Sequence, residues 1–186
     1  MTGTTAYAKS GSKMNKFWGG AAVGTKLVFA PHKDPRCVGV LDTATSPATF
    51  STVAVSTTIT SSGLYEGAAA VGSKVYFAPF YEPNVGVFDT TNDTYDTISL
   101  SPGMASPGAS SKYSGAAAVG TKVVFVPYTQ DTVGVLDTGT GAFTTVATTG
   151  AAASGAAKYK AGRCSFTLPK PVLKAPMVSS LETIIS

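Results

Sequence analysis

The sequence predicts an all-β fold built from consecutive copies of one four-stranded unit. One stretch is written three times, in the order aromatic, small residues, Val-Gly-Thr/Ser-Lys, apolar run, Pro, loop, Val-Gly-Val and Asp-Thr. Its turn glycines, Gly24, Gly72 and Gly120, recur every 48 residues. The composition, 44% hydrophobic and only 13% charged, suits a β-rich chain and argues against disorder. A period of this length indicates an array of repeats or a propeller.

The 186 residues are enough for one domain with a sizeable core. We expect this domain to span residues 16–157, as repeats at 16–63, 64–111 and 112–157. Residues 1–15 are predicted to be a flexible lead or the remnant strand of an earlier repeat. Residues 158–186 are predicted to be a degenerate repeat, a cap or an irregular tail, because the small-residue segment does not recur there.

Each repeat begins with a strand of small residues, at 19–23, 67–71 and 115–119. Small side chains in a strand indicate that another backbone approaches closely. We therefore expect these strands to be innermost, at a crowded centre. A bulky residue at Ala69 or Ala117 should force neighbouring units apart, whereas one at Thr97 or Thr145 should cost little.

The second strand follows a Gly-containing tight turn, which is a hairpin signal. It is predicted at 26–30, 74–78 and 122–126. Its residues are apolar on both faces, so we expect both faces to be covered. Pro31, Pro79 and Pro127 should end it, because proline cannot donate to a strand ladder.

The third strand is predicted at 38–41, 85–88 and 133–136, and the fourth at 49–55, 95–100 and 142–147. Asp-Thr opens the turn between them, and an Asx side chain is expected to stabilise it. Phe50, Tyr95 and Phe143 anchor the fourth strand. Four short antiparallel strands, small residues first and an aromatic last, predict one blade of a β-propeller.

These residues also carry a family resemblance. Gly19-Gly20, then Leu27-Val28-Phe29, Val40-Leu41-Asp42 and Phe50 resemble a kelch-type repeat, and the resemblance covers roughly residues 16–147. The second and third copies depart from it with Gly-Ala for the Gly doublet, and in all three copies Phe or Tyr replaces the usual Trp. The Val-Gly-Val-Leu-Asp-Thr strand is also similar to YVTN-type propeller repeats. Both resemblances imply a propeller.

Closed propellers typically need four to eight blades, so three blades do not close comfortably. In order of preference, the chain is a fragment of a longer propeller, a four-bladed ring completed by its termini, or an arc that closes by self-association with another copy.

Catalytic residues are hard to place. The single histidine, His32, stands where the other copies have Phe80 and Tyr128, so we expect a surface substitution rather than a base. Cys37 and Cys164 are far apart and are expected to remain free of a disulfide, and a four-ligand zinc site has too few donors. No nucleophile elbow, phosphate loop or dinucleotide fingerprint appears. We therefore expect no enzyme activity, no cofactor and no metal.

Residues 89–93 carry oxygen ligands at alternate positions, faintly as in a calcium loop. The sister turns lack the second and third carboxylates, so stabilisation of the turn is the better interpretation. The net charge of +4 is modest, and a basic bias appears only in the tail. We expect no nucleic-acid partner, since no known nucleic-acid-binding motif accompanies it. No apolar run approaches membrane-spanning length, and the chain as given shows no secretory signal, so no membrane partner is expected.

The loops after the prolines differ between copies, whereas the hairpin turns are nearly identical. Alternating connections place these loops at the same end as the long links between repeats, and a partner is expected there. The candidate binding residues are His32, Arg36, Phe80, Tyr81, Tyr128 and Gln130. The first hypothesis is a non-enzymatic binding or scaffold module for a protein partner, because aromatics are favoured interface anchors. The alternative is a carbohydrate-binding protein or a remnant of a propeller-type enzyme, with Phe80, Tyr81 and Tyr128 as the stacking surface.

Overall fold

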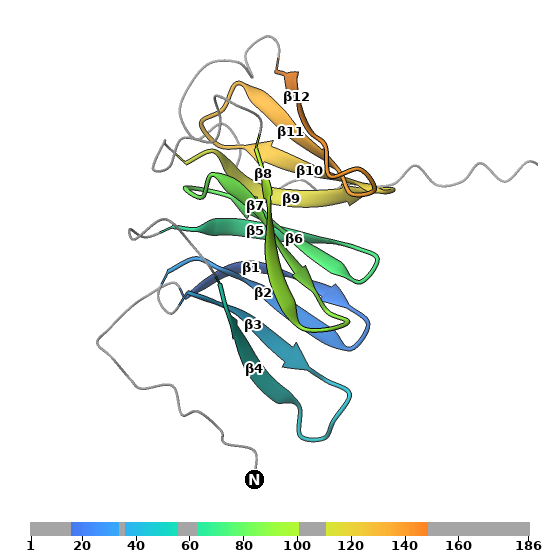
Figure 1. Cartoon of the computed structure of the whole chain (residues 1–186). Coiled ribbons are helices and arrows are strands. Elements are labelled where there is room, and N and C mark those ends of the chain that lie inside the picture. Colours follow the sequence, from blue (N-terminus) through green and yellow to red (C-terminus); the bar gives the residue numbers. More distant parts are fainter. Residues whose placement is uncertain (1–15, 34–35, 56–62, 101–110, 149–186) are drawn as a thin grey trace, which may run out of the picture.

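The computed structural model describes residues 16–33, 36–55, 63–100 and 111–148, and within these ranges it contains strands, turns and loops but no helix. The strands form three separate four-stranded antiparallel sheets (Figure 1), which we call blades 1, 2 and 3 in chain order. No helix of the described part is long and apolar enough to cross a membrane. The predicted lead at 1–15 and tail at 158–186 lie outside the described residues, as does Cys164.

The strand bounds follow the predicted repeats closely. Blade 1 contains β1 (Phe17–Val23), β2 (Lys26–Pro31), β3 (Cys37–Asp42) and β4 (Thr49–Ala54). Blade 2 contains β5 (Tyr65–Val71), β6 (Lys74–Pro79), β7 (Asn84–Asp89) and β8 (Thr94–Ser99). Blade 3 contains β9 (Tyr113–Val119), β10 (Lys122–Pro127), β11 (Thr132–Asp137) and β12 (Phe143–Ala147). The four-stranded meander and the prolines at the ends of the second strands are confirmed.

Two turns shape each blade. Val23 pairs with Lys26, which leaves Gly24 and Thr25 as a two-residue hairpin loop, and Gly24 has a φ of +55° that favours glycine. In the turn between β3 and β4, Asp42 Oδ1 accepts hydrogen bonds from Ala44 N at 2.9 Å and from Thr25 Oγ1 at 3.0 Å. These donors, the backbone N–H first, lower the pKa of Asp42. The predicted Asx stabilisation of this turn is confirmed.

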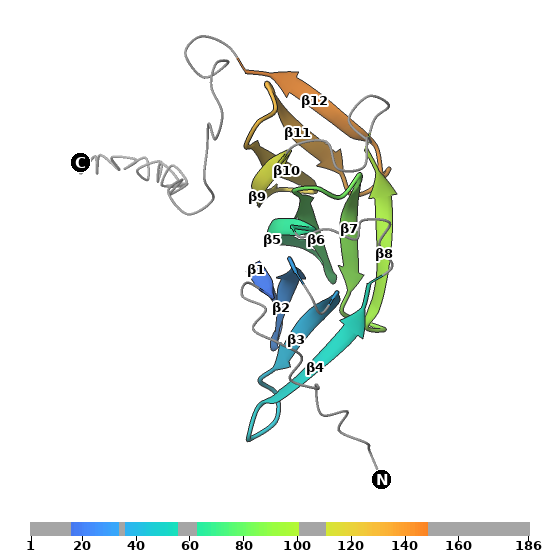
Figure 2. The ribbon, with the colours of Figure 1, turned by 90° about the vertical axis from the view of Figure 1, so that its left-hand side faces the viewer.

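The innermost strands β1, β5 and β9 lie side by side, and the outer strands β4, β8 and β12 lie on the opposite side of the molecule (Figure 2). Gly19, Gly67 and Gly115 all have positive φ, at 85°, 93° and 115°. A Cβ on Gly19 would lie 2.8 Å from Gly67 Cα, and a Cβ on Gly67 would lie 2.6 Å from Gly115 Cα. The backbones of the three inner strands therefore touch, which confirms the crowded centre.

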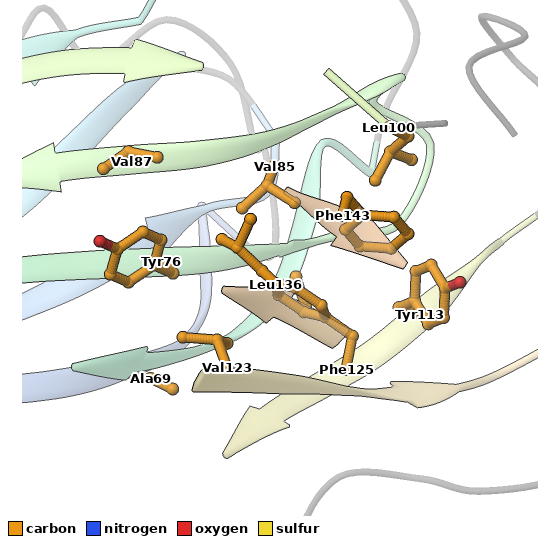
Figure 3. Packing of buried hydrophobic residues seen from close by; sticks show 11 residues of the cluster. Ala69, Tyr76, Val85, Val87, Leu100, Tyr113, Val123, Phe125, Leu136 and Phe143 are labelled. Carbon is orange, nitrogen blue, oxygen red and sulfur yellow. The ribbon is translucent and has the colours of Figure 1, made fainter. Parts of the chain in front are cut away.

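The core lies between the blades, in two clusters. One joins Val28 and Val40 of blade 1 to Val75 and Phe77 of blade 2. The other joins the opposite face of blade 2 to blade 3 (Figure 3). Blade 2 is thus covered on both faces, as its apolar second strand predicts. The same expectation is wrong for blades 1 and 3, because they end the stack and each of them packs on blade 2 through one face only.

Each blade has one aromatic face and one mainly aliphatic face, which in blade 2 also carries Tyr76. On the aromatic face, rings lie over the glycine of the third strand: a Cβ on Gly39 would lie 2.8 Å from Phe17 Cζ, and one on Gly134 would lie 2.8 Å from Phe143 Cζ. In blade 2 the Tyr65 and Tyr95 hydroxyls hydrogen-bond at 2.6 Å, and burial raises the pKa of Tyr65. In both clusters, the aromatic face of one blade packs on the aliphatic face of the preceding blade.

Candidate functional site

The loops after the prolines and the links between blades meet at one end of the molecule, held by backbone hydrogen bonds. In the link to blade 2, Leu64 N donates to His32 O at 2.8 Å, and Phe80 N donates back to Leu64 O at 3.0 Å. The link to blade 3 repeats this, since Lys112 N donates to Phe80 O at 2.8 Å and Tyr128 N to Lys112 O at 2.9 Å. We call this the loop end. The predicted meeting of loops and links is confirmed for the described ends of the two links between blades, and the third link lies almost wholly outside the described residues.

This hydrogen-bond pattern aligns rings from all three blades. The ring centroids of Trp18 and His32 are 4.9 Å apart, those of His32 and Phe80 6.2 Å, and those of Phe80 and Tyr128 5.4 Å. Tyr81 stands edge-on to Phe80, at 4.9 Å. We call these five residues the ring column.

His32 is buried, with only 4% of its surface exposed, so the expectation of a surface substitution is wrong. Its ring packs beside Trp18 and Phe80, and its Nδ1 lies 3.0 Å from Tyr65 O, a contact in which Nδ1–H donates. Burial lowers the pKa of His32, against the opposing effect of the Tyr65 hydrogen bond. Glu66 Oε1 lies 3.9 Å from Nδ1. The neutral ring is therefore a packing element that crosses from blade 1 to blade 2.

A lysine anchors the next loop in the same way. Lys112 is buried, and its Nζ donates to Tyr81 O at 3.2 Å. Burial lowers the pKa of Lys112 to about 8, and the negative charge of the buried Glu82 opposes that shift. Ser111 Oγ donates to the Tyr81 hydroxyl at 3.3 Å. These contacts hold Tyr81 in place on the link to blade 3.

The predicted binding residues divide into two groups. His32 and Phe80 are buried inside the ring column. They support the loop end by packing and have little surface available for contact with a partner. Arg36, Tyr81, Tyr128 and Gln130 are partly exposed in the same loops. Of these, Tyr81 and Tyr128 belong to the ring column, through their contacts with Phe80.

Sequence reasoning missed Trp18, which is 44% exposed and completes the ring column. Glu66 and Ser114 stand at its position in the other repeats and are buried. The sequence does contain a signal for this residue, because the three first strands are otherwise similar and carry unlike residues at this position. Among the described residues, no group of three His, Cys, Asp or Glu side chains could hold a metal ion.

Comparison with known proteins bears on the fold. No family model matches the chain, and no curated protein does. The chain is similar to virginiamycin B lyase from Staphylococcus aureus, with a TM-score of 0.51 and 14% identity over 66% of this chain and 38% of that one. It is similar to hydrazine synthase from Kuenenia stuttgartiensis, with a TM-score of 0.54 and 17% identity over 77% and 39% of the two chains. For a streptogramin B lyase the TM-score is 0.52 and the identity 14%, over 69% and 39%.

These structures are propeller-type proteins. The three sheets of this chain are propeller-type blades. The predicted fold class is therefore confirmed, and the chain spans 38% to 39% of the length of these three structures. At these identities the likeness concerns the fold alone. It shows propeller-type blades and does not identify the repeats as kelch repeats.

Proposed function

We propose that the chain is a non-enzymatic β-propeller-type binding module that presents its loop end to a protein partner. The observation that carries this proposal is the ring column, whose members Trp18, Tyr81 and Tyr128 reach solvent beside loops that differ between repeats. Aromatic rings held by packing lose little conformational freedom on binding and are favoured anchors of protein interfaces. We also propose that the repeats are of kelch type, on the Gly19-Gly20 doublet and the late Phe50.

The test is affinity capture followed by mass spectrometry, with the full chain as bait. Trp18→Ala and Tyr128→Ala remove exposed rings, and Trp18→Phe and Tyr128→Phe are the matched controls that keep a ring. A specific partner should bind the wild type and both controls and should be lost with both alanine variants. Equal capture by the alanine variants, in chains that melt like the wild type, would contradict the proposal.

A carbohydrate ligand is the second candidate, because the same exposed rings offer flat apolar faces on which a sugar ring can stack. A glycan array separates the two candidates. Saturable glycan binding that Trp18→Ala or Tyr128→Ala abolishes would favour the carbohydrate, and an array without signal leaves the protein partner ahead.

A further inference from the structure

The stack of blades ends in two apolar faces. Blade 1 leaves its aromatic face open, and its outer ring, Phe50, is 55% exposed. Blade 3 leaves its aliphatic face open, and the outer Val146 is 58% exposed. The other members of these faces are partly exposed: Phe17, Leu27, Phe29 and Leu41 on blade 1, and Val124, Val126, Val133 and Val135 on blade 3. Contiguous apolar surface of this kind marks an interaction site.

The repeats themselves show what covers such faces. Phe143 stands at the position of Phe50 and is only 8% exposed, because it packs in the cluster between blades 2 and 3. Val53 and Ile98 stand at the position of Val146, and both pack in inter-blade clusters. The residue types are thus those of an interior position, and only the place at the end of the stack exposes Phe50 and Val146.

The same interface is built twice within the chain. Each time the aromatic face of the later blade packs on the aliphatic face of the earlier one, the inner-strand glycines touch, and an amide of the link donates to the preceding loop. Of the two open faces of the stack, the one on blade 1 is aromatic and the one on blade 3 is aliphatic. Blade 1 can therefore follow blade 3 in the way that blade 2 follows blade 1.

Outside the three repeats, the sequence given lacks the residues that make up another aromatic face. Such a face needs rings from the first, second and fourth strands over a Val-Gly-Val strand, as Phe17, Phe29 and Phe50 provide in blade 1. Residues 1–15 and 149–186 contain Tyr7, Tyr159 and Phe166 as their aromatics and no Val-Gly-Val sequence. A second copy of the chain carries such a face complete, with its rings and its Val-Gly-Val strand.

We propose that two copies of this chain associate head to tail, with the aromatic face of blade 1 in each copy packed on the aliphatic face of blade 3 in the other. Two such contacts close a ring of six blades with two-fold symmetry, since a head-to-tail interface forms a ring when its rotation closes. Six blades lie within the four to eight of typical propellers. This proposal does not depend on the identity of a partner at the loop end.

The first test is the mass of the full chain, measured by size-exclusion chromatography with light scattering over a wide range of concentration. The expected mass is twice the chain mass of 18.8 kDa. Phe50→Glu and Val146→Glu each place a charge on one open face, and both should give monomers. Thr97→Glu is the matched control, because Thr97 is exposed on the outer strand of the middle blade, and it should remain a dimer.

Mixing the two variants tests the head-to-tail arrangement itself. In a mixed dimer, the Phe50→Glu copy contributes an intact blade 3 and the Val146→Glu copy an intact blade 1, so one of the two contacts is undamaged. An equimolar mixture should regain part of the dimer, whereas neither variant dimerises alone. Circular dichroism melts check that each variant is folded.

Three outcomes would overturn the proposal: a wild-type monomer at all concentrations, an assembly other than a dimer, or a dimer that Phe50→Glu and Val146→Glu leave intact. Monomeric variants that do not recover in the mixture would overturn the head-to-tail arrangement. Loss of the dimer leaves the ring column untouched, so partner capture at the loop end remains a separate measurement.

Discussion

His32 shows how one position of a repeat can exchange a ring of one chemistry for another. Phe80 and Tyr128 occupy the same place, and all three rings lie in the ring column. The imidazole adds a hydrogen bond to Tyr65 O that the other two rings do not provide there. That bond, together with burial, makes His32 the one member whose packing depends on protonation.

The free energy of unfolding should therefore fall as the pH drops through the range of a histidine. His32 is the only histidine of the chain, and its pKa in the folded protein is lowered from the ordinary value of 6.5. Its contribution is fully present above pH 6.5 and is lost as the pH falls below it, because the unfolded chain then binds the proton more readily. Between the two pKa values the slope is at most about 1.4 kcal/mol per pH unit.

Urea melts of the wild type and of His32→Phe, at a series of pH values from neutral to mildly acidic, measure this slope. The variant copies the residue at Phe80 and should show the flatter profile. Glu66 and Lys33 face the same ring, Glu66 favouring the charged form and Lys33 opposing it. Parallel profiles for the two proteins would mean that these neighbours leave His32 without a net effect.

Phe80 should be a stability residue first and a contact residue second. Its side chain is buried among the rings of His32, Tyr81 and Tyr128. Phe80→Ala should cost about 3–5 kcal/mol of unfolding free energy, as for other buried phenylalanines. Tyr128→Ala should cost clearly less, because Tyr128 is partly exposed. Equal losses in chemical denaturation would show that the column does not bury Phe80 more deeply than Tyr128.

At this scale the sequence could locate the variable loops but not the depth of each side chain. Phe80, Tyr81 and Tyr128 were found because they interrupt a repeating pattern. The burial of His32 depends on Trp18 and Phe80, which approach it from β1 and from blade 2. Such contacts join residues far apart in sequence, and no local pattern shows them.

At the scale of the element, the repeat period and the composition of each segment were enough to predict the strands. Alternating and two-sided apolar patterns placed the strands to within one or two residues, because a residue period of two and glycine turns leave little choice of register. The small-residue strands proved to be innermost, with Gly67 backbone against Gly115. The expectation at Ala117 needs correction: it is only partly buried, since it lies on the blade that ends the stack.

Ala69 is the position at which the crowded centre can be tested. It is buried in the cluster between blades 2 and 3 and pairs with Tyr76 across the hairpin. Ala69→Leu should cost about 1–3 kcal/mol, because overpacking shifts its neighbours. Thr97→Leu, at an exposed position of the outer strand, should stay within about 0.5 kcal/mol. Thermal melts of both variants decide it, and equal small shifts would mean that the inner strands have room.

At the scale of the whole molecule, the sequence predicted the blades and could not choose among the ways of closing a ring. Repeats give each blade the same two faces, but whether a face is covered depends on what stands beside it. The contrast between Phe50 and Phe143 is of this kind, since both are late aromatics and only their places in the stack differ.

The position of a blade in the stack should therefore set the cost of the same substitution. Phe29, Phe77 and Phe125 are equivalent, and Phe77 and Phe125 are fully buried while Phe29 faces the open end. In dilute protein, Phe77→Ala and Phe125→Ala should each cost about 3–5 kcal/mol and Phe29→Ala less. If two copies close the ring, the cost of Phe29→Ala should rise with protein concentration while the other two stay constant, because association stabilises the folded state by mass action. Denaturant melts at low and high concentration compare the three. An equal cost at all three positions in dilute protein would mean that the first blade is already covered within one chain.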